Sequence, residues 1–543
     1  MRPNAGKRMV GHNILWNGWE NMKEETVVKN LRKAVACLLV LVMVCSVIPV
    51  TSANAATQKQ FTVSGRTIKP VVKKGKDISK NVNVALKEAA ARAKPNKIYT
   101  VKIPKGTYYI SESMKVRSNT ILDATGCTIR AKKGFFNMIA TGSSEENAKA
   151  TGYNTYKNIT IKGGTWINYK SNSASGIRFC RGTNIVLKDI DMSHGSEKHM
   201  VEMAAVKNVK ITGCTFHDSD VKDSMKKCEA IQIDVCANEE LFSSLKYDGT
   251  ACENITIDGN TFENVSRGIG THSMLLNSYI SGVTITNNKF VNVTQEAIAC
   301  VNYTNCVISD NTMENVGGGI LFYFSKTSND SIYTAVNNGK TPFVGELCTN
   351  ANSVIENNRI ETRYHSLCDR NVGIELYGRN MPVAEVSADN GTIPAADYYV
   401  EGVTIRNNHI TAAGYGINLN DAKNNQIIGN TIEGANYDSA DPRKGQYCGI
   451  RIRTGSTGNV INENTVSGID QTGIMIYDNS SVSTLEENVV TNCSAFGIRV
   501  NLNSQVTQSM KNNTISGCPQ GAITVNTKAG CYVEGGTWNN IIK

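Results

Sequence analysis

The sequence predicts an all-β fold, a right-handed parallel β-helix (solenoid) with a short capping helix at its N-terminal end. Three observations in the 543 residues support this prediction. A phrase of the type Asn-Val-Thr-Ile recurs along the chain, its copies follow a base period of 22–26 residues, and a Gly-Ile pair recurs at a fixed place in the period. Repeats of this length cannot bury an apolar face alone, so neighbouring repeats must stack.

Each repeat is expected to contain three short strands. The first carries the Asn-Val-Thr-Ile phrase, as at 158–161, 254–257 and 402–405, the second follows an Asn bend, and the third begins at Gly-Ile, as at 176–177 and 473–474. Alternation at period 2 places the Ile side chains inside. Four longer gaps between copies carry insertions. A leucine-rich repeat has a similar period, but the regularly spaced Leu that it needs is absent.

An Asn marks the bend in most repeats. Asn tolerates left-handed backbone geometry, and stacked copies are expected to hydrogen-bond side chain to side chain. At about 4.8 Å per coil, roughly fifteen coils would form a rod about 70 Å long. The bend residues are Asn260, Asn288, Asn311, Asn358, Asn408, Asn430, Asn464, Asn488 and Asn513.

A short amphipathic helix is expected at 78–94, where it would cover the strand edges that the first coil leaves unpaired. The residues on its apolar face are Val82, Ala85, Leu86, Ala89 and Ala90. We therefore divide the chain into a leader at 1–55, an N-terminal extension at 56–77 and a β-helix domain at 78–543 that starts with this helix.

The leader has the three regions of a secretory signal peptide. Three basic residues at 29–33 precede an apolar run at 34–45, and small residues at 53–55 offer a cleavage site. Met22 is an alternative native start, and an uncleaved membrane anchor is the alternative to cleavage. We expect a secreted, extracellular protein without membrane attachment after signal cleavage, because no later apolar run reaches 18 residues.

Charge and cysteine content exclude some partners. The formal net charge of +10 falls to +6 without residues 1–55, which hold 7 Lys and Arg against 3 Asp and Glu, and no basic block suggests a nucleic acid partner. Fourteen of the 16 Cys lie after the leader, without CxxC pairs, so no structural metal site is predicted. A disulfide between Cys493 and Cys518, at equivalent places in neighbouring repeats, is one option.

The capping helix, the coils and the phrase Ile-Pro-Lys-Gly-Thr-Tyr at 103–108 together resemble the pectate-lyase and polygalacturonase superfamily of secreted β-helix proteins. The resemblance implies the same fold and activity on a polysaccharide bound along one face. Of four polygalacturonase motifs, the segments 229–234 and 270–273 are similar to the second and third. Residues 451–453 match the fourth motif only in part and lie about five coils further on, and the first motif is missing. Polygalacturonase activity itself is therefore not predicted.

The Gly-Ile strand aligns side chains into columns that point outward. Just before the strand lie His199, Glu229, Arg267 and Glu296. The first outward column is Arg178, Glu202, Gln232, Gly270, Ala299, Leu321, Glu375, Asn418, Arg451, Met475, Arg499 and Thr524. The second includes Cys180, Ala204, Asp234, His272, Val301, Tyr323, Tyr377, Asn420, Arg453 and Tyr477. Four insertions, at 217–228, 236–251, 325–350 and 378–400, border the same strand, and loops on a rigid scaffold often carry binding residues.

Glu202 and Asp234 are the best candidates for a catalytic pair. One coil and two residues separate them, which corresponds to about 8 Å between backbone positions. Inverting glycosidases hold their two carboxyl groups roughly 6.5–9.5 Å apart. Glu229 is an alternative acid, and His272 could move a proton or hold a sugar hydroxyl.

Other residues of this face are candidates for substrate binding. Arg178 and Arg267 suit a carboxylated or sulfated sugar, because Arg grips such groups with parallel hydrogen bonds. His199, Gln232 and Glu296 lie beside them. Tyr323 and Tyr377, with Tyr477, form a candidate stacking platform. The plain alternative is a solvated face on which opposite charges pair across strands.

Three functions therefore remain open. We favour a glycoside hydrolase, a monomer that acts on a polysaccharide and needs no cofactor. A polysaccharide lyase acting on a uronate polymer would use Arg267 or His272 and could require Ca²⁺, although no tight Asp cluster is visible. The third option is a non-catalytic rod that binds glycans or acts as an adhesin.

Overall fold

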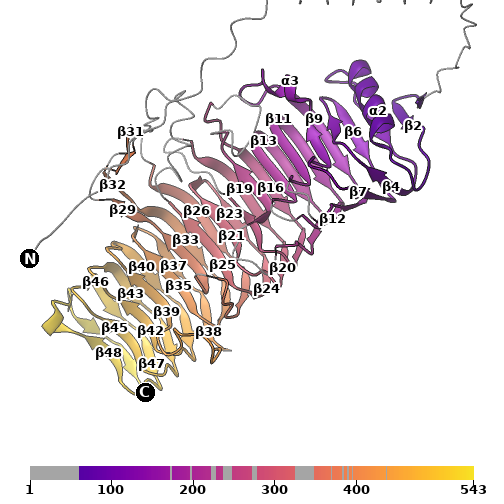
Figure 1. The fold of residues 1–543 in the computed structure, drawn as a ribbon. Helices are drawn as coiled ribbons and strands as arrows, with labels where there is room; N and C mark the ends of the chain where they lie inside the picture. The colour runs from indigo at the N-terminus through magenta and orange to yellow at the C-terminus, as the bar shows by residue number, and fades with distance from the viewer. Residues whose placement is uncertain are drawn as a thin grey trace, which may run out of the picture. The chain divides into compact units, whose positions relative to one another are not determined.

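The computed structural model describes residues 60–170, 174–195, 198–221, 228–236, 248–271, 278–324, 348–368, 370–381, 385–387, 391–393, 395–435 and 437–543. These residues lie in one compact unit, Lys59–Lys543, in which successive coils stack along one direction (Figure 1). The predicted leader at 1–55 falls outside the described residues. Each coil places its strands in parallel pairs with the coils before and after it, so the predicted parallel β-helix is confirmed.

The chain enters the stack through a hairpin and the capping helix. The hairpin strands β1 (Phe61–Ser64) and β2 (Thr67–Pro70) pair with each other, and β2 also pairs with the first strand of the coil stack. Helix α2 (Ser79–Arg92) follows, and Asp77 Oδ1 accepts hydrogen bonds from the Ser79 N–H (3.0 Å) and Oγ–H (2.7 Å). The helix buries Val82, Ala85, Leu86 and Ala89, whereas Ala90 stays partly exposed.

The second strand of each coil belongs to a separate 15-stranded parallel sheet. Its members are β4 (Gly106–Ile110), β7 (Cys127–Ala131), β10 (Thr165–Ile167), β12 (Asp191–Ser193), β14 (Thr215–His217), β17 (Thr261–Glu263), β20 (Lys289–Val291), β24 (Thr312–Val316), β27 (Arg359–Thr362), β34 (His409–Ala412), β38 (Thr431–Gly434), β41 (Thr465–Ser467), β44 (Val489–Thr491), β47 (Thr514–Ser516) and β51 (Ile541–Ile542).

The first strands form a ladder within a larger, 32-stranded sheet. After β1 and β2 it continues through β3 (Tyr99–Lys102), β6 (Thr120–Asp123), β9 (Tyr156–Lys162), β11 (Ile177–Lys188), β13 (Val201–Thr212), β16 (Glu253–Asp258), β19 (Ile280–Thr286), β22 (Tyr303–Thr304), β23 (Val307–Ser309), β26 (Asn350–Glu356), β33 (Val400–Arg406), β36 (Ala422–Lys423), β37 (Gln426–Ile428), β40 (Asn459–Asn462), β43 (Ser481–Glu486), β46 (Gln505–Lys511), β49 (Tyr532–Val533) and β50 (Thr537–Trp538).

The third strands form what we call the Gly-Ile ladder, in the same sheet. The long strands β11 and β13 contribute their first halves to it and their second halves to the previous ladder. Its other members are β5 (Met114–Val116), β8 (Ile139–Thr141), β15 (Glu229–Asp234), β18 (Arg267–Gly270), β21 (Glu296–Val301), β25 (Gly318–Tyr323), β28 (Val372–Tyr377), β35 (Tyr415–Asn420), β39 (Cys448–Arg453), β42 (Thr472–Ile476), β45 (Phe496–Val500) and β48 (Gly521–Val525).

Smaller elements lie outside the three ladders. The short helix α3 (Ser144–Asn147) has a capping box in which Ser143 and Glu146 bond each other's backbone. Two antiparallel pairs occur in the insertion after β28. They are β29 (Arg379–Met381) with β32 (Ala396–Tyr398), and β30 (Glu385–Ser387) with β31 (Gly391–Ile393). A 3-10 turn, η1 (Thr527–Ala529), follows β48.

The interior contains the predicted Asn ladder. Each bend Asn donates its Nδ2–H to the Oδ1 of the Asn in the next coil at 2.9–3.0 Å, from Asn260 through to Asn540. The left-handed residue, however, is the one before the bend Asn, such as Asn287, Asn357 or Asn407. The sequence interpretation therefore assigned the hydrogen bonding correctly and the left-handed conformation to the wrong neighbour.

Most of the remaining interior is apolar. Most Ile residues of the three ladders are fully buried, and Phe216, Phe262 and Phe290 stack with ring centroids 5.4 and 4.7 Å apart. All fourteen cysteines of the described residues are free thiols, and most of them are buried. The disulfide considered between Cys493 and Cys518 is not formed, and burial raises the pKa of the Cys493 thiol to about 12.

Candidate functional site

The register of the Gly-Ile ladder confirms the predicted outward columns. In the first column Arg178 pairs with Glu202, Glu202 with Gln232, and Gln232 with Gly270. Further along, the pairing runs from Leu321 through Glu375, Asn418, Arg451, Met475 and Arg499 to Thr524. Position in the sequence repeat thus translates directly into position on this face.

Glu202 lies at the outer surface of β13 but is largely shielded from solvent, with 7% of its surface exposed. The Ser175 hydroxyl donates a hydrogen bond to its Oε2 (2.6 Å), and Arg178 Nε lies 3.2 Å from the same oxygen. Glu202 and Arg178 therefore form the cross-strand ion pair that the plain alternative anticipated, and Arg178 itself is about one-fifth exposed.

Asp234 lies on the next coil and has no exposed surface. It pairs in register with Ala204, two residues beyond Glu202, so the offset on which the predicted carboxyl separation depends is present. Its backbone carbonyl accepts a hydrogen bond from the Cys252 thiol at 3.3 Å. The assignment of Glu202 and Asp234 as an acid/base pair stays a prediction.

Glu229, Arg267, Glu296 and His199 meet in a buried cluster. Arg267 Nη1 donates to Glu229 Oε1 at 2.8 Å and Arg267 Nε to Glu296 Oε2 at 3.2 Å. His199 Nδ1 lies 3.1 Å from the Glu229 carbonyl oxygen and 3.4 Å from Glu229 Oε2. Burial lowers the pKa of Arg267, but Glu296 and Glu229 raise it by more, so the net shift is upward and the guanidinium stays charged.

The cluster continues along later coils through Arg370. Its Nε lies 3.6 Å from Glu296 Oε1, and its Nη1 donates to Glu375 Oε2 at 2.5 Å. Asn418 Nδ2 donates to Glu375 Oε1 (2.6 Å), and Arg451 Nε donates to Asn418 Oδ1 (2.6 Å). We call the eight residues of this linked row the polar chain: His199, Glu229, Arg267, Glu296, Arg370, Glu375, Asn418 and Arg451.

Two of the three candidate stacking residues form a pair. The rings of Tyr323 and Tyr377 lie edge to face with centroids 5.1 Å apart, and the Arg370 guanidinium lies 4.7 Å from the Tyr377 ring centroid. Tyr477 is separated from them in the second column by Asn420 and Arg453 and packs at a second aromatic cluster with Tyr415 and Tyr447. Of the three rings considered for a stacking platform, only those of Tyr323 and Tyr377 are therefore neighbours.

A carboxyl pair lies at the end of β35, beside the insertion that carries β32. Asp421 is 3% exposed, and burial together with the neighbouring Asp397 raises the pKa of Asp421 to about 7. Lys423 forms an ion pair with Asp397, and its Nζ lies 4.3 Å from the centroid of the Tyr399 ring.

Sequence reasoning missed Arg370 and this carboxyl pair. The residues that it considered just before the strand end at Glu296, whereas Arg370 and the carboxyl pair lie on later coils. His199 lies two residues before β13, and Arg370 lies two residues before β28. Applying the same position to the later strand would therefore have found Arg370. Nothing comparable signals Asp397, because it comes from an insertion outside the repeat. His272 lies outside the described residues.

Two further properties of the described part of the chain bear on function. It holds no group of three or more His, Cys, Asp and Glu side chains placed to bind a metal ion. None of its helices is long and apolar enough to cross a bilayer.

The stacked coils and the interior Asn ladder define a right-handed parallel β-helix protein. Residues 386–538 match the family described as "Right handed beta helix region". The chain is 23% identical, over 247 residues, to plasmin and fibronectin-binding protein A of Streptococcus pneumoniae. The match covers 39% of this chain and about a third (34%) of that protein's length.

Solved structures are similar to this chain at low sequence identity. A tailspike protein mutant of the Escherichia coli bacteriophage HK620, in complex with a pentasaccharide, is 13% identical, with a TM-score of 0.52 over 86% of this chain and 78% of its own. PfbA, a surface adhesin of Streptococcus pneumoniae, is 17% identical, with a TM-score of 0.49 over 83% of this chain and 89% of its own. The similarity to the tailspike shows the architecture and leaves the activity open.

Proposed function

We propose that this protein is an extracellular glycan-binding β-helix that uses the outward face of the Gly-Ile ladder. The observation that carries the proposal is the polar chain, because each of its side chains is fixed by its neighbours over successive coils. Groups that are locked before the ligand arrives lose little conformational entropy on binding. Six of its eight members are buried, Arg370 and Arg451 are partly exposed, and Arg370 lies beside the Tyr323–Tyr377 pair.

The electrostatics favour binding over cleavage. Glu202, Glu229, Glu296 and Glu375 each bond an arginine. Each of these carboxylates has an oxygen occupied by an arginine, which fixes the side chain in place and leaves it less free to reach the oxygen of a leaving group. An adhesin and a tailspike bound to a pentasaccharide share the fold, and we extend sugar binding and an extracellular or surface location to this chain as part of the proposal.

The binding proposal is tested with a panel of acidic and neutral polysaccharides and the variants Tyr323→Ala and Tyr377→Ala. Truncating an aromatic residue at the centre of a binding surface costs about 1 kcal/mol or more, so affinity should fall at least about fivefold. Tyr532→Ala, an exposed residue on β49, is the matched control and should leave affinity unchanged. Unaltered binding by folded Tyr323 and Tyr377 variants would remove this face from the proposal.

Glycoside hydrolysis is the second candidate, favoured by the one-coil, two-residue offset of Glu202 and Asp234. New reducing ends without the ultraviolet absorbance of an unsaturated uronate product would show hydrolysis. In that case Asp234→Asn should lower the rate by at least about a hundredfold, as expected for loss of a general acid or base. Reducing ends together with that absorbance would show a lyase instead, and neither signal on a bound glycan would leave binding alone.

A further inference from the structure

The net charge of the chain is the sum over regions whose formal charges have opposite signs. Residues 60–170 hold 21 Lys and Arg against 6 Asp and Glu, a formal balance of +15. Residues 171–543 hold 28 against 38, a balance of −10. The positive region is the N-terminal part of the coil stack with its capping helix, coloured indigo to purple in Figure 1.

Few of these cations are neutralised within their own region. Four of its six acidic residues already form ion pairs, in Arg92–Glu88, Arg117–Glu146, Lys132–Asp77 and Lys162–Asp123. Most of its lysines are exposed and form no ion pair with any described carboxylate. An excess of one sign over a continuous surface raises the local concentration of ligands of the other sign.

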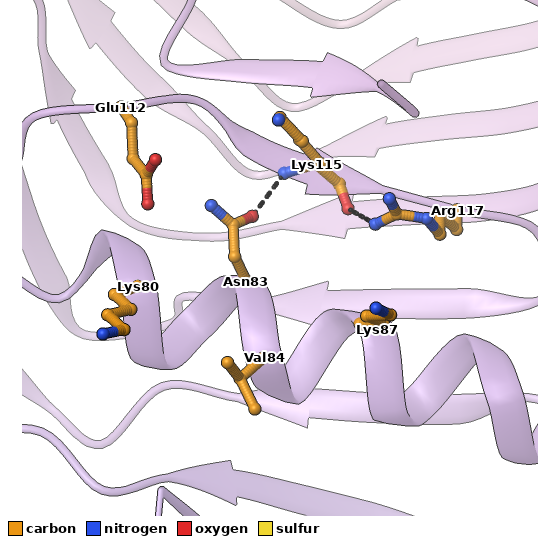
Figure 2. Close-up of a pocket in the computed structure, with 7 residues that line it drawn as sticks. All are labelled: Lys80, Asn83, Val84, Lys87, Glu112, Lys115 and Arg117. Atoms are coloured by element: carbon orange, nitrogen blue, oxygen red, sulfur yellow. Dashed lines mark hydrogen bonds between the residues drawn. The ribbon is translucent and has the colours of Figure 1, made fainter. Parts of the chain in front are cut away.

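A pocket of about 250 Å³ lies between α2 and β5 within this region (Figure 2). Its lining residues are Lys80, Asn83, Val84, Lys87, Glu112, Lys115 and Arg117. The lining therefore contains four cations and a single carboxylate. Its volume is below the roughly 300–1,000 Å³ of sites that enclose a whole drug-sized ligand.

The pocket has a fixed wall and unbonded cations. Asn83 bridges helix and strand, because its Nδ2 donates to the Ser113 carbonyl (2.8 Å) and its Oδ1 accepts from the Lys115 N–H (2.8 Å). Arg117 Nη1 donates to the Lys115 carbonyl at 3.1 Å. Figure 2 shows this hydrogen bond and the one from the Lys115 N–H to Asn83. The ammonium groups of Lys80, Lys87 and Lys115 form no ion pair with any described residue.

We propose that this basic end is a second binding site, for a hydrophilic polymer that carries sulfate or phosphate groups. One anionic group would occupy the pocket, held by Lys80, Lys87 and Lys115, while neighbouring groups of the polymer contact the exposed lysines around it. Ammonium and guanidinium donors suit such oxyanions, which accept several charge-assisted hydrogen bonds at once. The site goes beyond the proposed glycan-binding face and is built from different coils.

The lining of the pocket also argues for the class of ligand. No aromatic side chain lines it, whereas proteins that bind single-stranded nucleic acid stack bases on aromatic rings. Val84 is its only apolar residue, and a helix that lies on a membrane needs a broad apolar face. A hydrophilic anionic polymer is the ligand class that these residues fit.

The test is a calorimetric titration of the purified protein with heparin-type sulfated oligosaccharides and, separately, with poly(glycerol phosphate). We expect saturable binding that weakens as salt is raised. The double variant Lys80→Glu/Lys87→Glu should lose at least tenfold in affinity. The matched double variant Lys528→Glu/Lys543→Glu, exposed residues near the other end of the chain, should stay within twofold. The charge-conserving variant Lys80→Arg/Lys87→Arg should retain binding.

The two ligands distinguish sulfate from phosphate as the preferred group, and polygalacturonate tests whether carboxylate density alone suffices. Absence of binding to both polymers would overturn the proposal, as would equal losses in the two Lys→Glu variants. Tighter binding to duplex DNA or to anionic lipid vesicles than to either polymer would assign the site to another class of ligand. Tyr377→Ala should leave this binding unchanged, which separates its outcome from that of the proposed function.

Discussion

Asp421 is a buried carboxyl group whose neighbour is another carboxyl group. Burial and Asp397 raise its pKa from 3.8 to about 7, so between these values the folded protein keeps a proton that the unfolded chain has released. A group of this kind stabilises the fold fully below its unfolded pKa, and the contribution is lost as pH rises through the folded pKa. The insertion that carries Asp397 is therefore tied to β35 by a contact that depends on pH.

We expect the melting temperature to fall as pH rises from about 4 to 7, and Asp421→Asn to remove most of that decline, because the amide cannot ionise. Thermal unfolding followed over this range checks the expectation. Asp258→Asn is a control of opposite sign, since hydrogen bonds from Asn287 and Thr286 lower the pKa of Asp258. The stability that Asp258 contributes should be lost only as pH falls below 3.8, so the control is followed to lower pH, and it should leave the decline between about 4 and 7 unchanged. Equal pH profiles for wild type and Asp421→Asn would contradict this account.

The Asn ladder is the element that joins the coils on their interior side. Asn408 shows the pattern: its Nδ2 donates to Asn430 Oδ1 (3.0 Å) and the Ile355 carbonyl (2.9 Å), and its Oδ1 accepts from the Asn358 N–H (3.0 Å) and Nδ2–H (2.9 Å). Replacing Asn408 leaves buried donors and acceptors without partners, which costs far more than the bond itself contributes.

Asn408→Ala should lower the free energy of unfolding by about 2–4 kcal/mol, through loss of a buried network. Asn526→Ala is the matched control, because Asn526 is partly exposed and bonds only Asn501 among the described side chains (2.8 Å). It should cost less than about 1 kcal/mol. Denaturant unfolding of both variants measures the difference, and similar losses would indicate that the interior ladder adds no special stability.

How much the sequence could predict follows from what the repeat contains. The strands, the columns and the Asn bonds all follow from the period, because one repeat constrains the next. The contacts of Glu202, Asp234 and Glu229 depend on which neighbouring side chains reach them, and Arg370 reaches Glu296 from the segment before β28. Insertions such as the one with Asp397 follow no period, so their position could not be predicted.

At the scale of the whole molecule, the division of charge is the main feature that composition concealed. The formal charge is +15 in residues 60–170 and −10 in residues 171–543. Together with residues 1–59 these give the total of +10, and that total alone suggests an evenly basic protein. The glycan-binding face proposed for the later coils and the basic site proposed at the capping helix would thus operate in opposite electrostatic surroundings. One rigid scaffold could hold two different polymers at separate places.

The bonding of each coil only to its two neighbours has a consequence for how such a chain can change. A coil behaves as a module with the same donors and acceptors on both sides, since each ladder Asn bonds the Asn before and after it. Gene duplication or deletion of one complete period would therefore lengthen or shorten the stack without creating a new kind of interface. Such a change would alter the distance between the two ends of the stack in steps of one coil. The chemistry of each end would stay the same.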